Sequence, residues 1–306
     1  MSCRILFWGP AQEKNMISYA ISMACCGKVM TRELANAFRK SKLRNVEITL
    51  AVYTQENEIS RESEKLTLEL IGEGTIHPAS VHLPFCGIWD PSELNEEKRK
   101  YNIACFSRLI QEHSGLLGEH MTLHASAEPP LAEHPARIDQ VCRSLEDLMP
   151  LAERFGFSIN MEFLPRTCVG NSVDELQRIM RRFDAKHVGI CLDVNHIMNR
   201  AEELPAIIHE LAPRIRSFHI NDYDNVDEVH WLAGQGCIDW IGVMKEIRTI
   251  PEDVLLIHET VWQLQSQDHK VDPVWQLRQI ETACWFLENC NTVMPSIRDF
   301  KIPGNI

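Results

Sequence analysis

The segment SFHINDYDNVDEVHWLAGQGCIDW, residues 217–240, contains the pattern that decides the fold of this chain. It begins as an apolar strand and then changes abruptly into a loop. The loop region carries four side chains of the kinds that bind metals, His219, Asp222, Glu228 and His230. Gly234 and Gly236 permit a tight turn, and Asp239 marks the start of a helix. A buried strand, a polar loop and a helix therefore follow one another.

The same succession of strand and helix repeats along the chain. Short apolar or β-branched runs predict strands at 17–23, 46–52, 79–85, 120–125, 157–163, 187–193, 214–220 and 254–259. Amphipathic segments predict helices near 31–41, 60–72, 95–113, 136–154, 172–183, 201–212, 238–248 and 273–289. Eight strands alternating with eight helices predict an α/β fold, a closed (β/α)8 or TIM barrel.

One barrel domain is expected to cover residues 1–306, because no Gly/Ser linker or low-complexity tract divides the chain. The last stretch, 291–306, lacks strong periodicity and is expected to form a C-terminal arm on the barrel or on a neighbouring subunit. The main alternative fold is an open doubly wound sheet. Its phosphate-binding G-x-G-x-x-G motif after the first strand is absent.

Composition restricts the partners and the compartment. The chain has 31 Lys and Arg against 43 Asp and Glu, a formal charge of -12, which repels nucleic acid. The 11 cysteines show neither zinc-ribbon nor secreted-framework spacing, which favours reduced thiols in a cytoplasmic protein. No stretch near 18 consecutive apolar residues appears, so no membrane association is expected.

Potential metal ligands stand at successive predicted strand ends, where TIM barrels place their reactive groups. From the third strand to the eighth these residues are His82, His124, Glu162, Asp193 with His196, His219 and Glu259. A single strand-end histidine is more often a hydrogen-bonded core residue. An unpaired buried charge is costly, however, and clustering around a cation removes that cost. The set as a whole therefore predicts a metal site.

Side-chain alternation separates two neighbours in the eighth predicted strand. Either His258 or Glu259 must face the barrel interior while the other faces the helices. Leu255 and Ile257 share a face with Glu259 and suit the interior. We therefore expect Glu259 to point inward and His258 to have a structural role.

These residues resemble the xylose isomerase-like barrels, a superfamily that includes sugar-phosphate isomerases, ketose 3-epimerases and endonuclease IV. The resemblance covers roughly residues 46–290 and is carried by SVHLPF, TLHAS, NMEFLPRT, CLDVNH, FHINDY, HWLAGQGCIDW and LLIHE, in that order. The D-x-x-H of Asp193 and His196 and the G-x-G-x-I-D-W of residues 234–240 are its most specific parts. The first 45 residues match poorly.

The resemblance implies a metal site, which takes a different form in each of two branches of the superfamily. In the epimerase branch the positions of Glu162, Asp193, His219 and Glu259 hold one divalent metal, and the two glutamates act as acid and base. His196 stands where that branch binds substrate. The endonuclease IV branch holds three zinc ions, and its ligand positions fall on His82, His124, Glu162, Asp193, His196, His219, Glu228, His230 and Glu259.

Two departures from these family patterns are visible. Glu228 stands where the endonuclease branch has Asp, and Asn225 stands where ketose 3-epimerases carry Arg. The loop residues of 217–240 can therefore complete a multi-metal site or line a polar sugar pocket. The donor set suits Mn, Mg or Co, and recruitment of further histidines favours Zn.

The function expected from this chemistry is a metal-dependent sugar isomerase or epimerase. Its substrate would be a ketose, an aldose or a polyol-derived carbohydrate, and the proton would move through an ene-diolate. A lyase, dehydratase or hydrolase acting on a sugar-like molecule is the alternative. An endonuclease IV-like repair enzyme is disfavoured by the acidic charge.

Loop residues suggest the walls of the pocket. Trp89, Trp231 and Trp262 follow predicted strands and can stack on sugar faces, although each can equally serve as packing. Arg166 can bind a substrate oxygen or form a salt bridge with a neighbouring loop. The terminal arm and the pairing habit of the superfamily favour a homodimer or homotetramer.

Overall fold

The computed structural model describes residues 16–262 and 271–290, and its strands form a closed barrel. The strands are β1 (Ile17–Ser22), β2 (Asn45–Thr49), β3 (His77–His82), β4 (His120–Leu123), β5 (Ser158–Glu162), β6 (Val188–Asp193), β7 (Ile215–Ile220) and β8 (Val254–His258). The helices are α1 (Arg32–Phe38), α2 (Glu58–Gly72), α3 (Glu96–Glu112), α4 (His134–Phe155), α5 (Val173–Met180), α6 (Leu204–Leu211), α7 (Trp240–Ile247) and α8 (Pro273–Asn289).

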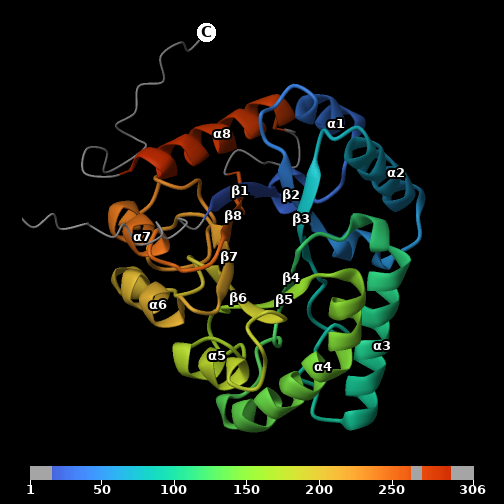
Figure 1. Ribbon diagram of the computed structural model, residues 1–306, viewed down its shortest axis with the longest axis vertical. Helices are drawn as coiled ribbons and strands as arrows, with labels where there is room; N and C mark the ends of the chain where they lie inside the picture. The colour runs from blue at the N-terminus through green and yellow to red at the C-terminus, as the bar shows by residue number, and fades with distance from the viewer. Residues whose placement is uncertain (1–15, 263–270, 291–306) are drawn as a thin grey trace, which may run out of the picture.

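The barrel closes through parallel pairing of its first and last strands. Each strand pairs with the next in chain order, and β1 pairs with β8 from Ile17–Val254 to Ile21–His258. The helices form an outer ring, in which α8 lies beside α1 (Figure 1). The TIM barrel prediction is confirmed. The predicted C-terminal arm, residues 291–306, lies outside the described residues.

The predicted strands run past their observed C-terminal ends in several places. The expected strand 46–52 ends at Thr49, where a 3-10 turn over Leu50–Thr54 begins. The expected strand 79–85 is observed as His77–His82. Leu50 and Leu83, which directly follow these strands, are buried like the strand residues, so composition alone does not mark where pairing stops.

Alternation along β8 separates two apolar layers. Val254 and Leu256 belong to the main core between the strands and the helices. Leu255 and Ile257 form a separate small cluster with Ala20 and Ala79, which only strand residues build. The face that carries Leu255 and Ile257 therefore points into the barrel, as expected from the sequence.

His258 occupies the opposite face of β8 and is fully buried under α8. Its Nε2 lies 3.4 Å from the Sγ of Cys284, a residue of α8. Burial lowers the pKa of His258 to about 3, so the ring is neutral at neutral pH. His258 therefore lies on the side of β8 that faces α8, as the alternation along the strand predicts.

Capping residues fix where the helices that follow β5 and β7 begin. Ser172 caps α5 by accepting a hydrogen bond from the backbone N–H of Glu175. Asp239 caps α7 by accepting from the backbone N–H of Gly242. Each cap satisfies an N–H group that the helix itself leaves free, and so sets the length of the preceding loop.

Across residues 16–262 and 271–290, the helices are all too short or too polar to cross a lipid bilayer.

Gly118, just before β4, is packed against the backbone of β3. A Cβ atom at this position would lie 2.1 Å from the carbonyl O of Pro78. We therefore expect Gly118→Ala to lower the free energy of unfolding by about 1–3 kcal/mol, as overpacking does elsewhere. Urea denaturation measures this change.

Gly72 provides the control, because a Cβ added there meets nothing within 4 Å. Gly72 is the last residue of α2, so Gly72→Ala should leave stability unchanged or raise it by up to about 1 kcal/mol. Equal effects of the two substitutions would contradict the packing argument.

Candidate metal centre

The ends of four adjacent strands bring the four predicted metal ligands together. Glu162 ends β5, Asp193 ends β6, His219 is the penultimate residue of β7, and Glu259 directly follows β8. One ligand atom from each lies within 4.8 Å of the others. Glu162, Asp193 and His219 are almost completely buried, and the Glu259 side chain is 19% exposed. The separate segments therefore converge on one point.

His219 lies at the centre of this group. Its Nδ1 is 3.1 Å from Glu162 Oε1, 3.2 Å from Glu259 Oε2 and 3.8 Å from Asp193 Oδ2. Its other ring nitrogen, Nε2, is 3.3 Å from Oε1 of Glu47. One imidazole therefore contacts carboxylates on both sides.

Burial and charge act in opposite directions on these groups. Burial alone would raise the pKa of Glu162, but the charges of His124 and His219 hold that pKa well below its usual value. Burial alone would lower the pKa of His219, but the surrounding negative groups, which include Glu259, Glu47 and Glu162, hold it well above the usual value. Glu162 and His219 therefore each stabilise the charged form of the other.

The four residues fit a divalent cation. Asp193 Oδ2 is buried and accepts no hydrogen bond among the described residues. Buried anionic oxygens without a donor are unfavourable unless a cation compensates them. Three carboxylates with one imidazole suit Mn, Mg, Co or Zn. The structure thus supplies the donor set that the sequence predicts, and it leaves the identity of the metal open.

Two further predicted histidines lie on the other side of Glu162. His82 Nε2 and His124 Nε2 are 3.3 Å and 2.8 Å from Glu162 Oε2. His82 also contacts the main-chain O of Leu83 through Nδ1, at 2.8 Å. With Nδ1 as the donor, Nε2 remains available to a metal. His82, Glu162 and His219 form a second group of donor atoms within 4.8 Å of one another.

A third group contains Asp193, His196 and His230, again within 4.8 Å. His196 Nδ1 lies 2.9 Å from the main-chain O of Phe163, and its Nε2 lies 3.6 Å from Asp193 Oδ2. Glu228 is held by Arg166, whose Nη1 is 2.9 Å from Glu228 Oε1. The additional predicted ligands are therefore all near the centre, but Glu228 already has a cationic partner.

A cavity of about 460 Å³ opens onto these groups. Its walls include Glu162, Glu259, His82, His124, His196, His230, Glu228, Arg166, Phe85, Leu164 and Pro165. Phe85 stacks on His124 with ring centroids 4.2 Å apart and forms part of an apolar side. The cavity wall therefore combines polar side chains that can bind metals with apolar side chains that offer packing contacts. This composition is typical of small-molecule sites.

Arg166 lines this cavity but is engaged by acidic loop residues. Besides Glu228, it contacts Glu128 at 3.4 Å and Asp227 at 3.1 Å. Its backbone has a φ of 50°, a conformation that residues other than glycine seldom adopt. The structure therefore places Arg166 in an inter-loop salt-bridge cluster at the cavity wall.

The three predicted tryptophans are not among the residues that line this cavity. Trp89 packs edge-on against Phe106, and Trp262 donates from Nε1 to the backbone O of Cys25. The backbone of Trp231 pairs with that of Asp222. These contacts are those of packing and loop-forming residues, so substrate stacking by these side chains remains a prediction.

Asp222 organises the loop that follows β7. Its carboxylate accepts from the backbone N–H groups of Tyr223, Gly234 and Ile238 and from Nε1 of Trp240. A Cβ on Gly236 would lie 2.2 Å from Asp222 Oδ1 and from the carbonyl O of Tyr223. Asp222 therefore holds the loop, whereas His219, Glu228 and His230 reach the cavity region.

Asn225, which stands where the ketose 3-epimerases carry Arg, caps a neighbouring turn. Its Oδ1 accepts a hydrogen bond from the backbone N–H of Ala201 at 3.0 Å. Asn225 has a φ of 65° and is not among the residues lining the cavity. The side chain at this position therefore supports the loop.

Glu47 is the residue that the sequence reasoning missed. It lies in the middle of β2, is fully buried, and reaches His219. The sequence signal for Glu47 is an acidic residue inside the otherwise largely apolar run VEITLAV, which indicates a buried carboxylate. Glu47 does not stand at a strand end, where TIM barrels place their reactive groups, but in the middle of β2.

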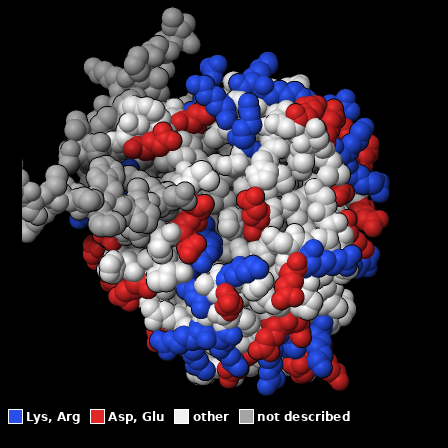
Figure 2. Space-filling view, viewed as in Figure 1, with Lys and Arg blue, Asp and Glu red and all other residues white. Residues whose placement is uncertain are grey.

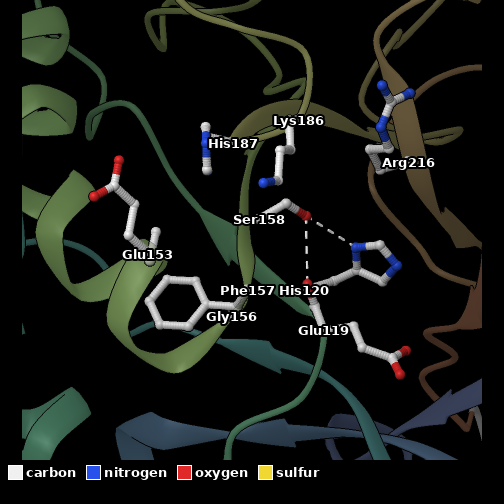
Figure 3. Close-up of a pocket in the computed structure, with 10 residues that line it drawn as sticks. Glu119, His120, Glu153, Gly156, Phe157, Ser158, Lys186, His187 and Arg216 are labelled. Carbon is white, nitrogen blue, oxygen red and sulfur yellow. Dashed lines mark hydrogen bonds between the residues drawn. The ribbon is translucent and has the colours of Figure 1, made fainter.

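A second cavity of about 460 Å³ lies at the opposite end of the barrel (Figure 3). His120 and Ser158 begin β4 and β5, and Arg216 is the second residue of β7. His120 Nδ1 is 3.1 Å from Ser158 Oγ. In TIM barrels, residues at the N-terminal ends of the strands contribute to stability, whereas reaction sites lie at the C-terminal ends.

A family model described as xylose isomerase-like TIM barrel matches residues 36–276, so this chain belongs to that family. An uncharacterised protein of Methanocaldococcus jannaschii is 26% identical over 179 residues, which are 56% of this chain. The match spans 61% of that relative's own length.

Solved structures share the fold. A D-tagatose 3-epimerase-like protein has a TM-score of 0.68 at 21% identity, with 89% of this chain and 98% of that chain covered. A D-psicose 3-epimerase from Clostridium cellulolyticum H10, solved with D-tagatose, has a TM-score of 0.70 at 14% identity, with 89% and 98% covered. The IOLI protein, solved with a zinc atom, has a TM-score of 0.66 at 15% identity, with 90% and 100% covered.

Metal binding should stabilise the folded chain, since a ligand that binds only the native state adds free energy. At a concentration one hundred times Kd the gain is about 2.7 kcal/mol. We expect Mn²⁺ to raise the Tm of the metal-free wild-type chain by several degrees. Asp193→Asn should lose most of this rise. Differential scanning fluorimetry with and without Mn²⁺ measures it.

Glu252→Gln is the matched control, because this carboxylate is exposed. It should keep the full rise in Tm. An equal rise in Asp193→Asn and the wild type would show that the ion binds elsewhere.

Proposed function

We propose that this chain is a metal-dependent isomerase or epimerase of sugars, acting by proton transfer at carbon. One observation carries the proposal. Glu162 and Glu259, from β5 and the end of β8, both line the same cavity and both lie within 3.2 Å of His219 Nδ1. Two carboxylates beside one metal-binding point are what removal and return of a carbon-bound proton require.

The roles of the protein groups follow from this arrangement. A bound divalent ion would supply the positive charge that polarises a carbonyl and stabilises an ene-diolate. Glu162 Oε1 or Glu259 Oε2 takes the proton from carbon, and the other carboxylate returns one. If the two act from opposite faces the carbon is inverted, and if one carboxylate acts alone the proton moves along the chain. His196 lines the cavity and is proposed to bind a substrate oxygen.

The charges of the cavity favour an uncharged carbohydrate. Four glutamates, Glu128, Glu162, Glu228 and Glu259, are among its described lining residues. Arg166, the one Arg or Lys among those residues, already contacts three carboxylates. A phosphate would therefore meet a negative wall. Family membership and fold similarity to sugar epimerases support the same class of substrate.

The three groups of donor atoms favour a second candidate, a hydrolase or lyase that uses more than one metal. An endonuclease IV-like enzyme would be a multi-metal hydrolase of this kind. Such an enzyme needs a basic surface that binds the phosphates of DNA. Both basic and acidic side chains lie on the face viewed in Figure 2, and the net charge is -12. These charges support the sugar substrate over DNA.

The acid and base assignment is tested by incubating the metal-loaded chain with ketoses, aldoses and inositols in heavy water. Deuterium should enter one carbon position of the true substrate. We expect Glu162→Gln and Glu259→Gln each to slow this exchange roughly 10²–10⁴-fold, the range for general acid–base catalysis. Mass spectrometry measures deuterium, and elemental analysis confirms metal content.

Glu252→Gln should exchange at the wild-type rate. Near-normal exchange in either active-site variant would refute its assigned role. No exchange with any sugar, together with cleavage of an abasic duplex, would favour the repair enzyme.

A further inference from the structure

Glu47 is a buried carboxylate that does not line the cavity. It lies in β2, its residue is 0% exposed, and it is not among the residues that line the cavity. Its Oε1 accepts from Ser80 Oγ at 3.0 Å and Thr122 Oγ1 at 3.3 Å, and it faces His219 Nε2 at 3.3 Å. The chain therefore keeps a negative charge in the barrel interior, where a charge is costly.

The two hydroxyl groups do not explain that charge. A glutamine of the same size could accept hydrogen bonds from Ser80 and Thr122 through its amide oxygen at a smaller desolvation cost. The negative charge acts on the nearby histidines, of which His219 is the one in contact and His82 lies beyond it.

The His219 ring connects Glu47 to the metal centre. Its Nδ1 faces Glu162, Asp193 and Glu259, whereas its Nε2 faces Glu47. A neutral imidazole carries one proton, and only the form protonated on Nε2 leaves the Nδ1 lone pair for a metal. An ionised carboxylate can only accept, so Glu47 selects that form.

We propose that Glu47 is a positioning residue, which orients His219, fixes its tautomer and raises its basicity as a metal ligand. This inference rests on the metal centre of the proposed function. Carboxylate partners of metal-binding histidines have this effect in other proteins.

The other histidines of the site provide an internal comparison. His82 and His196 place Nδ1 at 2.8 Å and 2.9 Å from the backbone carbonyls of Leu83 and Phe163. Those acceptors orient a ring but carry no net charge. His196 Nδ1 also lies 3.4 Å from Glu162 Oε1. Compared with His82, whose Nδ1 contacts a backbone carbonyl, His219 has in Glu47 an anionic partner that makes it the more strongly donating imidazole.

The test is titration calorimetry of Mn²⁺ into the metal-free wild-type chain and Glu47→Gln. The variant keeps the size and one acceptor but loses the charge. We expect the Kd for Mn²⁺ to rise about 10–100-fold, the typical loss on changing such a partner. A Kd within twofold of the wild-type value would overturn the proposal.

Asn160→Ala controls for a merely structural lesion. Asn160 is fully buried in β5 and hydrogen-bonds Ser217 Oγ at 3.2 Å. This variant should lower the free energy of unfolding yet bind Mn²⁺ with the wild-type Kd. A weakened Kd in Asn160→Ala equal to that in Glu47→Gln would overturn the specific role of Glu47.

A second measurement needs no variant of Glu47. In the zinc-loaded wild-type chain, ¹⁵N NMR of the histidine rings should show His219 protonated on Nε2, with its signals assigned by their loss in His219→Gln. A proton on Nδ1 would overturn the proposal even if Glu47→Gln fails to fold. If the wild-type chain binds neither ion, the metal centre and the positioning role both fail. If it binds and Glu47→Gln binds equally well, only the positioning role fails.

Discussion

The structure depends on one constraint, which is that ionised groups inside a closed barrel must be compensated where they lie. Glu47, Glu162 and Asp193 are all essentially inaccessible to water. Each reaches His219, whose two ring nitrogens face opposite ways. One imidazole carries at most a single positive charge, and a divalent cation beside it would compensate more of this negative charge. The acidic centre is therefore the observation that supports the proposed metal site.

Barrel closure makes that convergence available. The pairing of β1 with β8 brings the ends of the strands around one axis, so residues far apart in sequence meet. Glu162 and Glu259 are separated by almost a hundred positions, yet both contact His219. The helices of the outer ring bury the opposite faces of the strands (Figure 1) and keep the strand ends in position.

The loop after β7 shows how similar residues acquire different tasks. Asp222 and His219 lie three positions apart, but Asp222 turns its carboxylate toward the backbone of its own loop. His230 and Glu228 then approach the cavity from that loop. Arg166 pairs with Glu228, which joins the loop after β5 to the loop after β7. The mouth of the cavity is thus shaped by contacts between loops.

By itself, the sequence determined the order of strands and helices, and hence the barrel, because burial of alternating apolar runs depends mainly on local periodicity. It also indicated the four candidate ligands at the strand ends, which the structure brings together because barrel geometry fixes where such residues meet. It did not determine the role of Glu47, because contact with His219 arises only when β2 and β7 face each other across the interior. Nor did it settle the positions of the tryptophans and Arg166, because these depend on packing between loops whose partners are remote in the chain. Local pattern decides which elements form, and only the closed tertiary structure decides which side chains meet inside it.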